Sequence, residues 1–363
     1  MKEEAGSPID VEKAQEIIDY AVKNGVNYFD TAYVYHEGKS EEFLGKALSK
    51  YPRDSFYLAD KFPGYDLANI PKVEEIFEEQ LRRCGVTYFD FYLFHNVCEM
   101  NIDAYLDRQY GIYDYLLRQK AEGRIRHLGF SVHGSYDVMQ RFLDAYGESM
   151  EFGQVQLNYI DWTFQNAEAK VKRLGELGIP VWVMEPLRGG ALANPPAEVR
   201  AMMERYPVQC SPVEWAFRYV GDFDQVAVML SGMSDEAQVQ DNLRIFENVR
   251  PGCLSDADKR LIARLRTGYR KRMPIGCTGC AYCVPCPRGV GIPRVFAAYN
   301  EAAMFDRMAD FPRRYQSFVE NKQDAGRCVR CGLCEGKCPQ HLPIRELLEQ
   351  VAAELKKKEE PET

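Results

Sequence analysis

Short apolar runs alternate with stretches of helical periodicity from residue 26 to residue 246, and this alternation constrains the fold more than any other feature. Short hydrophobic strands separated by amphipathic helices indicate parallel βαβ units. The predicted strands are 26–29, 56–61, 88–95, 126–131, 154–159, 180–185 and 225–231. The predicted helices are 9–24, 40–50, 71–84, 103–122, 137–146, 167–177, 212–219 and 235–246.

The strand count predicts a barrel that lacks one strand. A closed barrel of this type has eight strands, whereas seven are predicted here and the polar residues before the first helix supply no other. We therefore expect an α/β fold of the (β/α)8 barrel type whose first strand is missing from this chain. A start codon assigned too far downstream would remove the first strand from this sequence. The alternative is an open seven-stranded barrel.

Composition narrows the class of protein. With 363 residues, the chain is long enough for a full barrel and a second domain. The net charge of −8 argues against nucleic-acid binding, which needs a basic face. No apolar run is long enough to span a membrane, and the first residues lack the apolar core of a signal peptide. We therefore expect a cytoplasmic protein that binds neither nucleic acid nor a membrane.

Complementary chemical groups follow the first three predicted strands. Asp30 and Tyr35 come just after the first strand, Lys61 ends the second and His95 ends the third. In a barrel, these ends meet at the active-site face. A free tyrosine loses its proton only near about pH 10, but an adjacent ammonium stabilises the phenolate. The set therefore suits proton transfer to a carbonyl oxygen that His95 polarises.

Each of these residues also has an ordinary structural explanation. A strand-end Asp caps helices, Lys61 could be a surface charge, and His95 could be a loop residue with satisfied hydrogen bonds. Their joint occurrence at three successive strand ends favours the catalytic interpretation. Four aromatic residues are candidates for an apolar substrate pocket: Tyr65, Trp162, Phe164 and Trp182.

Eight of the twelve cysteines lie in two tight groups near the C-terminus. The groups are Cys277, Cys280, Cys283 and Cys286, and then Cys328, Cys331, Cys334 and Cys338. In a reducing compartment, such spacing indicates metal or cluster ligation rather than disulfides. In two-cluster ferredoxins the fourth cysteine of each motif binds the other cluster. That rule pairs Cys338 with the first three cysteines of the first motif, and Cys286 with the first three of the second.

Two departures from the bacterial ferredoxin pattern favour an α-helical module. Two residues rather than three precede Cys286, and forty-one residues separate the motifs, with 295–308 predicted as a helix. The alternative is a pair of four-cysteine zinc sites, although such sites usually pair two CxxC elements. The other four cysteines are interpreted as ordinary core or surface residues: Cys84, Cys98, Cys210 and Cys253.

With these motifs the chain resembles the aldo/keto reductase family fused to a C-terminal ferredoxin-like (dicluster) domain. The segments that carry the resemblance are Asp30-Thr31-Ala32-x-x-Tyr35 and Ser40-Glu41-x-x-Leu44-Gly45, followed by a strand-end lysine and a strand-end histidine. The resemblance implies a catalytic tetrad in which Tyr35 is the general acid/base. It also implies NAD(P)(H) as cofactor, and two [4Fe–4S] clusters on the eight cysteines.

The resemblance also assigns the dinucleotide contacts. They are Ser131, Gln156, Ser231, Gly232, Met233, Gln238 and Asn242. Gly232, Ser234 and Gln238 occupy the positions where the family commonly has the lysine and arginine that select the 2′-phosphate of NADP. Because these positions carry no lysine or arginine, we do not expect the chain to prefer NADP.

The sequence divides into four segments. These are an aldo/keto reductase-like barrel over 1–255, a basic helical connection over 256–272, a 4Fe–4S ferredoxin-like domain over 273–350, and a disordered tail over 351–363. The basic connection is interpreted as a solvated helix face, with docking of an acidic electron-transfer partner as the alternative.

These observations predict an oxidoreductase that interconverts a small carbonyl substrate and its alcohol by hydride transfer. A simple reductase needs no iron–sulfur cluster, so the clusters imply single-electron exchange with a ferredoxin-like or flavin partner. The alternative is an electron-transfer subunit whose barrel is a non-catalytic partner-binding scaffold. A zinc-stabilised binding module is a third, weaker interpretation.

Overall fold

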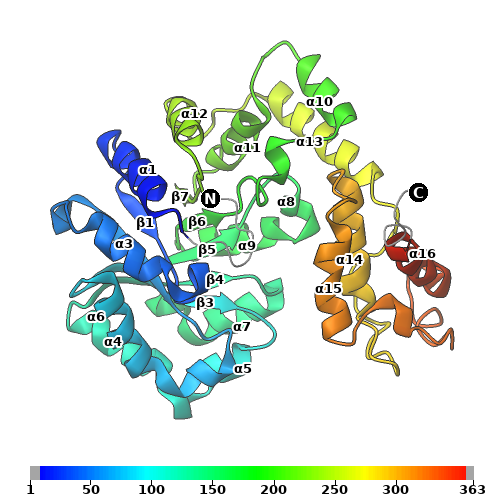
Figure 1. Cartoon of the computed structure of the whole chain (residues 1–363), viewed down its shortest axis with the longest axis horizontal. Helices are drawn as coiled ribbons and strands as arrows, with labels where there is room; N and C mark the ends of the chain where they lie inside the picture. Colours follow the sequence, from blue (N-terminus) through cyan, green and yellow to red (C-terminus); the bar gives the residue numbers. More distant parts are fainter. Residues whose placement is uncertain (1–8, 357–363) are drawn as a thin grey trace. The chain divides into compact units, whose positions relative to one another are not determined.

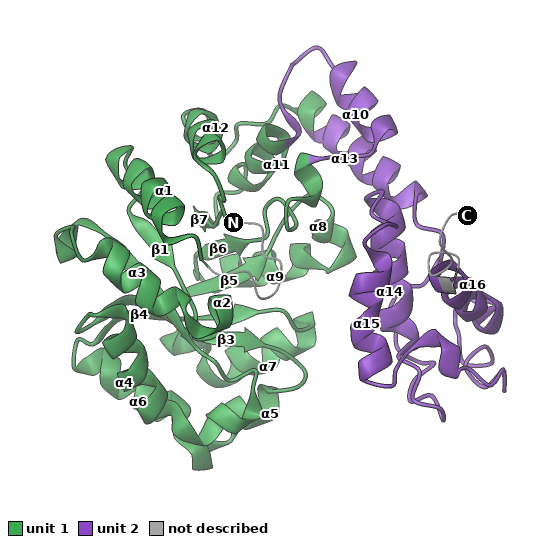
Figure 2. Cartoon of the chain, viewed as in Figure 1, with its two compact units in different colours: residues 1–193, 213–258 green, residues 194–212, 259–363 purple. Residues whose placement is uncertain are grey.

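The computed structural model describes residues 9–356 and divides the chain into two compact units (Figure 2). The first comprises 1–193 and 213–258, and the second comprises 194–212 and 259–363. The predicted boundary after residue 255 lies close to the divide after 258, whereas 194–212 belongs to the second unit although the sequence placed it in the barrel.

The first unit is built on a curled sheet of seven parallel strands among the residues that the structure describes (Figure 1). The strands are β1 (Tyr28–Asp30), β2 (Tyr57–Phe62), β3 (Phe89–Val97), β4 (Ile125–Val132), β5 (Phe152–Gln156), β6 (Val181–Met184) and β7 (Val226–Met229). They follow one another in the sheet in chain order. Each lies within three residues of its predicted limits.

The first and last strands of the sheet, β1 and β7, are less buried than the inner strand β2. No residue of β1 or β7 is fully buried, whereas five of the six residues of β2 are. Between β1 and β7 there is no strand pairing among the described residues. The helix layer is continuous at this place, because α1 (Val11–Lys23) contacts α12 (Glu236–Phe246).

Helices follow the strands as the periodicity predicts. Those of the first unit, after α1 and before α12, are α2 (Tyr35–Gly38), α3 (Ser40–Leu48), α4 (Val73–Cys84), α5 (Ile102–Leu106), α6 (Ile112–Ala121), α7 (Tyr136–Tyr146), α8 (Asp161–Phe164), α9 (Ala167–Glu176) and α11 (Pro212–Gly221). The single helix predicted over 103–122 is wrong. It is divided at Gly111, which is left-handed with φ of 62°, a conformation that glycine adopts without cost.

The alternation of side chains along the strands separates the barrel interior from the helix layer. Inward-facing Ala59, Phe152 and Trp182 belong to a hydrophobic layer, with Tyr28 and Phe91 packed against it. Two residues further along β1, β2 and β5, the same faces carry the polar residues Asp30, Lys61 and Gln154. Trp182 is therefore a core residue of the barrel rather than part of a substrate pocket.

The second unit is helical, with no strand among its described residues. Its helices are α10 (Ala197–Glu204), α13 (Asp256–Lys271), α14 (Ile292–Met304), α15 (Phe311–Glu320) and α16 (Ile344–Lys356). The helix predicted over 295–308 is α14, shifted toward the N-terminus. The predicted tail begins at 351, yet α16 continues to Lys356; residues 357–363 lie outside the described part of the chain.

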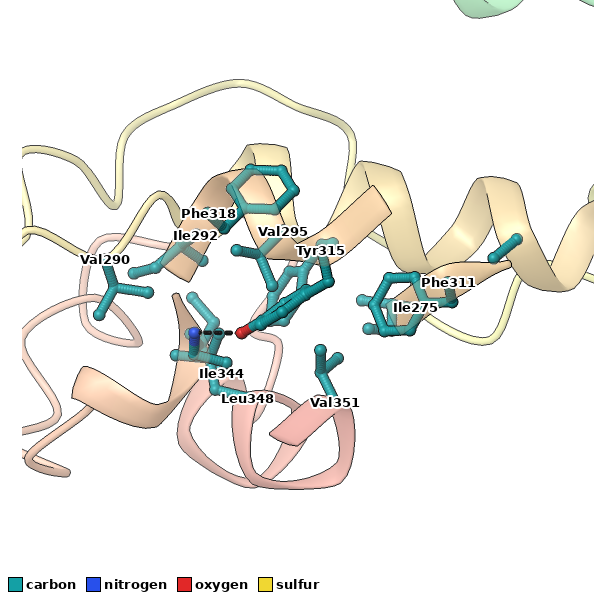
Figure 3. Packing of buried hydrophobic residues seen from close by; sticks show 13 residues of the cluster. Ile275, Val290, Ile292, Val295, Phe311, Tyr315, Phe318, Ile344, Leu348 and Val351 are labelled. Atoms are coloured by element: carbon teal, nitrogen blue, oxygen red, sulfur yellow. Dashed lines mark hydrogen bonds between the residues drawn. The ribbon is translucent and has the colours of Figure 1, made fainter. Parts of the chain in front are cut away.

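A compact apolar cluster holds α14, α15 and α16 together (Figure 3). Val295, Phe311 and Leu348 are at most 1% exposed within it. The Tyr315 hydroxyl accepts a hydrogen bond from the Ala325 backbone N–H at 2.5 Å, which fixes the segment before the second cysteine motif. Six of the eight grouped cysteines pack against this cluster. The cysteine loops are therefore anchored on a core that the polypeptide forms by itself.

Candidate active site and candidate cluster sites

The four predicted tetrad residues come together at the C-terminal ends of β1, β2 and β3. The Lys61 ammonium is fully buried, forms an ion pair with Asp30, and donates to the Thr31 carbonyl oxygen at 2.7 Å. It lies 5.1 Å from the centre of the Tyr35 ring. The His95 ring stands nearly perpendicular to that ring, with 6.1 Å between the two centres.

The local backbone directs Tyr35 toward this site. Tyr35 begins α2, and the two residues after it, His36 and Glu37, are left-handed with φ of 52° and 58°. Asn96, which follows His95, is also left-handed, with φ of 56°. Such conformations are uncommon for residues other than glycine, and each costs about 1 to 3 kcal/mol. Backbone strain thus concentrates next to the two rings.

Burial and charge determine the protonation of this group. Burial alone would lower the pKa of Lys61, but the charges of Asp30 and Tyr35 outweigh it and raise that pKa. Burial raises the pKa of Asp30 and Lys61 opposes that rise. Burial, and then the Lys61 charge, hold the pKa of His95 well below its usual value. The site therefore contains a charged lysine and a neutral histidine at pH 7.

Two buried polar atoms of the tetrad have no hydrogen-bond partner in the described part of the chain. They are Asp30 Oδ2 and His95 Nδ1.

The ring of Tyr65 stands perpendicular to the His95 ring with 5.1 Å between centres, so this candidate pocket residue does line the site. Trp162 instead stacks on Phe223, with 4.7 Å between ring centres.

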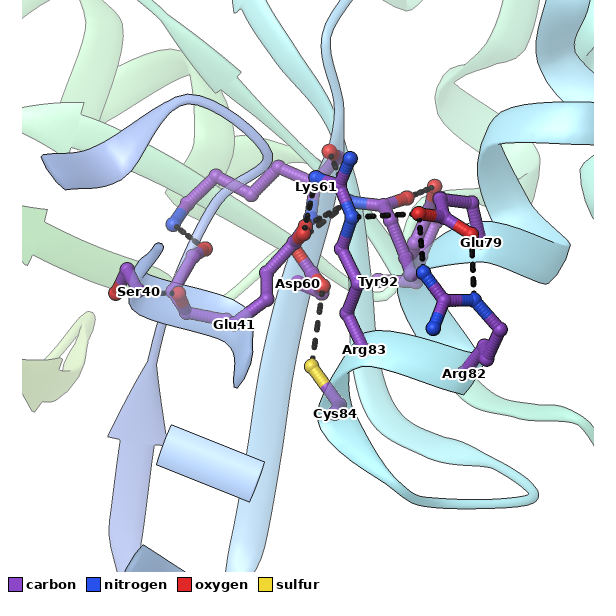
Figure 4. Close-up of polar contacts among 11 residues, drawn as sticks. Ser40, Glu41, Asp60, Lys61, Glu79, Arg82, Arg83, Cys84 and Tyr92 are labelled. Atoms are coloured by element: carbon purple, nitrogen blue, oxygen red, sulfur yellow. Dashed lines mark hydrogen bonds and ion pairs between the residues drawn. The ribbon is translucent and has the colours of Figure 1, made fainter. Parts of the chain in front are cut away.

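A second polar cluster, which the sequence analysis missed, lies on the helix side of β2 (Figure 4). Asp60 precedes Lys61 and its side chain therefore points to the opposite face of the strand. The Gln80 amide donates to Asp60 Oδ1 at 2.9 Å and to Glu41 Oε1 at 3.0 Å. Asp60, Glu41 and Gln80 are all fully buried. We call Asp60 and Glu41 the buried acid pair.

The buried acid pair has one cation against two carboxyl groups. Arg83 donates to Glu41 Oε2 at 3.0 Å, while Asp60 accepts from the Lys61 backbone N–H at 2.8 Å. Burial, and then the nearby Glu41 charge, raise the pKa of Asp60 well above its usual value. Asp60 therefore holds its proton more tightly in the folded chain than a free aspartate does. Glu41 was noticed only as part of a family motif, and no sequence signal showed that α3 and α4 would enclose both acids.

Two predicted cofactor contacts lie at neighbouring strand ends. The Ser131 hydroxyl, on β4, accepts from the Asn96 backbone N–H at 2.8 Å. The Gln156 amide, on β5, donates to Asp161 at 2.8 Å. Asp161 is fully buried and also forms an ion pair with Arg188. The Ser131 hydroxyl hydrogen and the Gln156 carbonyl oxygen remain suited to an amide ligand such as a nicotinamide carboxamide.

The other predicted contacts form one segment, in which Ser231, Gly232 and Met233 follow β7 and precede α12. Asn242 donates to the Ser231 hydroxyl at 3.0 Å, and Gln238 accepts from the Ser234 backbone N–H at 2.8 Å. Asp235 caps α12 by accepting from the Gln238 backbone N–H at 2.9 Å. The Asp235 carboxylate thus occupies the N-terminal end of α12. A phosphate bound there would compete with this carboxylate for the backbone N–H groups of the helix.

The eight grouped cysteines line two separate hollows of the second unit. One is lined by Cys277, Cys280, Cys283 and Cys338. The other is lined by Cys286, Cys328, Cys331 and Cys334, and Cys283 lines this hollow as well. This is the crossed arrangement expected for two cubane clusters. None of the eight grouped cysteines forms a disulfide, and no three His, Cys, Asp or Glu side chains in residues 9–356 converge on a single-ion site.

The ungrouped cysteines behave as the sequence predicts, because Cys84 and Cys98 are buried while Cys210 and Cys253 are half-buried. No helix of the described chain has the length and apolar character that crossing a bilayer requires.

Comparison with known proteins agrees with both units. Residues 2–252 match the model of the aldo/keto reductase family, and residues 276–343 match that of a 4Fe-4S dicluster domain. The chain is 29% identical over 212 residues to a probable aldo-keto reductase 1 of Glycine max, a match that covers 56% of this chain and 57% of that protein. It is 26% identical over 284 residues to the NADH-specific methylglyoxal reductase of Escherichia coli, covering 66% and 83%.

Solved structures show the same fold. The holo form of aldo-keto reductase AKR11C1 from Bacillus halodurans is 26% identical, with a TM-score of 0.60 over 72% of this chain and 89% of that one. An aldo-keto reductase from Klebsiella pneumoniae in complex with NADPH has a TM-score of 0.58 at 20% identity, over 72% and 87%. The chain therefore belongs to the aldo/keto reductase family and carries a 4Fe-4S dicluster domain after the part that matches the family.

Proposed function

We propose that this oxidoreductase interconverts a small carbonyl compound and its alcohol, with Tyr35 as general acid/base, and that it exchanges single electrons through two [4Fe–4S] clusters. The observation that carries the first part is the contact of a buried, charged Lys61 with both Asp30 and the face of the Tyr35 ring. Neutral His95 stands beside that ring. A structural scaffold has no need for a buried ammonium at the strand ends.

Each tetrad residue has a distinct task in the proposed reduction. Lys61 remains charged and favours loss of the Tyr35 proton, since a nearby ammonium stabilises a phenolate. Tyr35 gives that proton to the carbonyl oxygen as negative charge develops on it. His95, neutral because it is buried beside Lys61, donates one N–H to the same oxygen. Asp30 keeps Lys61 in place and charged.

A bound nicotinamide would supply the hydride. Ser131 and Gln156 fit its carboxamide, and the segment from Ser231 to Asn242 fits the rest of the dinucleotide. We propose NAD(H) rather than NADP(H), since Asp235 caps α12 and none of the positions 232, 234 and 238 carries a cation. The Escherichia coli relative is likewise described as NADH-specific.

The eight grouped cysteines would hold the two clusters, which supply single-electron transfer. Cys277, Cys280, Cys283 and Cys338 form the first site. Cys286, Cys328, Cys331 and Cys334 form the second. The sulfurs lie on loops around a hydrophobic core, which excludes water from the inner side of each site.

Substitution of Tyr35 tests the proposal. Tyr35→Phe removes only the hydroxyl, and we expect the rate of methylglyoxal reduction by NADH to fall by about 100-fold or more, in line with the contribution of general acid catalysis. The visible absorbance of the clusters should not change. Tyr57→Phe is the matched control, since Tyr57 lies on β2 and is 47% exposed. Unchanged turnover in Tyr35→Phe would contradict the assignment.

A further inference from the structure

The second cluster site opens onto an unusual surface of the second unit. Val329 and Leu333, which line this hollow, are 57% and 58% exposed, and Cys331 is itself exposed. Large apolar side chains so close to a ligand loop bring no stability while they face water. Exposed apolar groups beside polar ones are typical of interaction sites.

Cationic side chains line the same hollow as these apolar ones. Arg288 and Lys337 line the same hollow and are exposed. The nearest acids are already engaged, since Glu335 bonds Arg345 and Glu349 bonds Arg330. We call Arg288, Lys337, Val329 and Leu333 the cationic rim. Residues 273–350 carry ten Lys and Arg against eight Asp and Glu, although the whole chain has a net charge of −8.

The first cluster site lacks this character. Its lining besides the cysteines consists of neutral side chains, among them Thr278, Gln340 and Leu342. A negatively charged partner is therefore attracted to the second cluster site rather than to the first. An attractive potential raises the rate of encounter between proteins and orients them before contact.

We propose that the cationic rim is the docking face for an acidic, single-electron carrier protein. The inference rests on the proposed function, because it takes the cysteines as cluster ligands. One electron crosses the face, so that either the chain or the carrier is oxidised while the other is reduced, and no bond or proton is transferred. Val329 and Leu333 supply the apolar centre of the contact, and Arg288 and Lys337 its charged edge.

The test compares two charge reversals of equal size. Arg288→Glu/Lys337→Glu changes the cationic rim, whereas Arg260→Glu/Arg264→Glu changes exposed residues of α13, the alternative basic surface. Each variant, reduced with dithionite, is mixed with an oxidised acidic [2Fe–2S] ferredoxin in a stopped-flow instrument. We expect the second-order rate constant of the rim variant to fall about tenfold at low salt and to approach the parent value at about 0.5 M salt. The α13 variant should stay within about twofold.

Two further measurements make the result specific. With cytochrome c, a basic acceptor, the rim variant should react faster than the parent. Binding of a redox-inert, gallium-substituted ferredoxin, followed by calorimetry, should weaken only in the rim variant. Equal losses in both variants, or a loss confined to the α13 variant, would overturn the proposal.

The outcome is separable from that of the proposed function. Iron content and methylglyoxal turnover are measured on the same preparations. A chain with a full iron complement, normal turnover and rim-independent ferredoxin reduction overturns the docking face alone. A chain without iron overturns both the cluster assignment and the docking face.

Discussion

The two candidate centres of this molecule are built in opposite ways. In the barrel, Lys61 is completely buried and its charge is balanced by Asp30 within the polypeptide. In the second unit, none of the eight grouped cysteines is fully buried, and Cys280 and Cys331 are exposed. The charge of Lys61 is thus balanced within the polypeptide, whereas the cysteine sites need an inorganic group to join their sulfurs. Damage to the two centres should therefore have different consequences.

The difference follows from how each backbone is held. Register with neighbouring strands places Lys61 beside Leu93 of β3, so its position is fixed by the whole sheet. The cysteines lie on loops with left-handed residues such as Ala281 and Arg330, with φ of 63° and 57°. Tight turns of this kind suit CxxC wrapping, and the loops are held by packing of six cysteines on the hydrophobic core rather than by strand register.

Loss of Lys61 should produce the largest effect. Lys61→Met leaves Asp30 buried without its cation, and removing one partner of a buried ion pair costs about 3 to 5 kcal/mol. We expect methylglyoxal turnover to fall by about 100-fold or more as well. Denaturation followed by circular dichroism gives the free energy of unfolding, and NADH oxidation gives the activity.

A double variant separates these two consequences. Asp30→Asn/Lys61→Met removes both charges, so most of the lost stability should return while the activity stays low. Iron content should match that of the parent in both variants, because the damage is confined to the first unit. Recovery of turnover in the double variant would show that Lys61 acts only on stability.

Loss of a single cysteine should have an intermediate effect, confined to the second unit. Cys338→Ala removes one of the four cysteines that line the first cluster site. Iron should fall from about eight to about four per chain, if each site holds one [4Fe–4S] cluster. The remaining electron paramagnetic resonance signal should be that of an isolated cluster. Cys253→Ala, at a half-buried cysteine outside both motifs, is the control.

The same variant tests the crossed ligation. Loss of the cluster held by Cys328, Cys331 and Cys334, with retention of the other, would contradict it. Methylglyoxal reduction by NADH should persist in Cys338→Ala, because the tetrad makes no use of the cysteines. Its loss would show that the two centres depend on each other, contrary to the comparison drawn above.

The contrast also explains what could be predicted from the sequence. The order of the seven parallel strands was inferred correctly from periodicity. The structure also brings together the four residues of the tetrad and the cysteines of the two motifs, and their catalytic and ligand roles stay predictions. These features are local, or follow from general rules for parallel sheets and cluster motifs. The helix boundary at Gly111 and helices α15 and α16 were not predicted, although a glycine and the amphipathic sequences of these helices are local signals for them. Contacts between distant segments, in contrast, leave no such local signal.

The buried acid pair is the clearest example of such long-range dependence. Asp60 and Glu41 belong to different elements, and each would be an ordinary surface acid if viewed alone. They meet because Gln80 of α4 donates to both. Single-sequence reasoning gives no indication of which helix face will cover a given strand residue.

Asp60→Asn should have the smallest effect, and in the opposite direction to the others. A carboxyl whose pKa is raised on folding stabilises the protein only at low pH, and this contribution is lost as the pH rises from the unfolded value of about 4 toward the folded value. Between these two values the native state therefore keeps a proton that the unfolded state has released, and above them it carries a buried carboxylate. An asparagine amide supplies a permanent hydrogen in place of that proton. We expect Tm at pH 8 to rise by about 2 to 4 °C.

The pH dependence identifies the cause. The gain should shrink as the pH is lowered toward about 4, where Asp60 is protonated in both states. Asp54→Asn, at an exposed carboxylate before β2, should leave Tm unchanged at every pH. Destabilisation of Asp60→Asn by the same amount at all pH values would mean that the pair is fully ionised. The barrel would then tolerate two buried carboxylates with Arg83 as their cation, and the balance of charges around Lys61 would have to be reassigned.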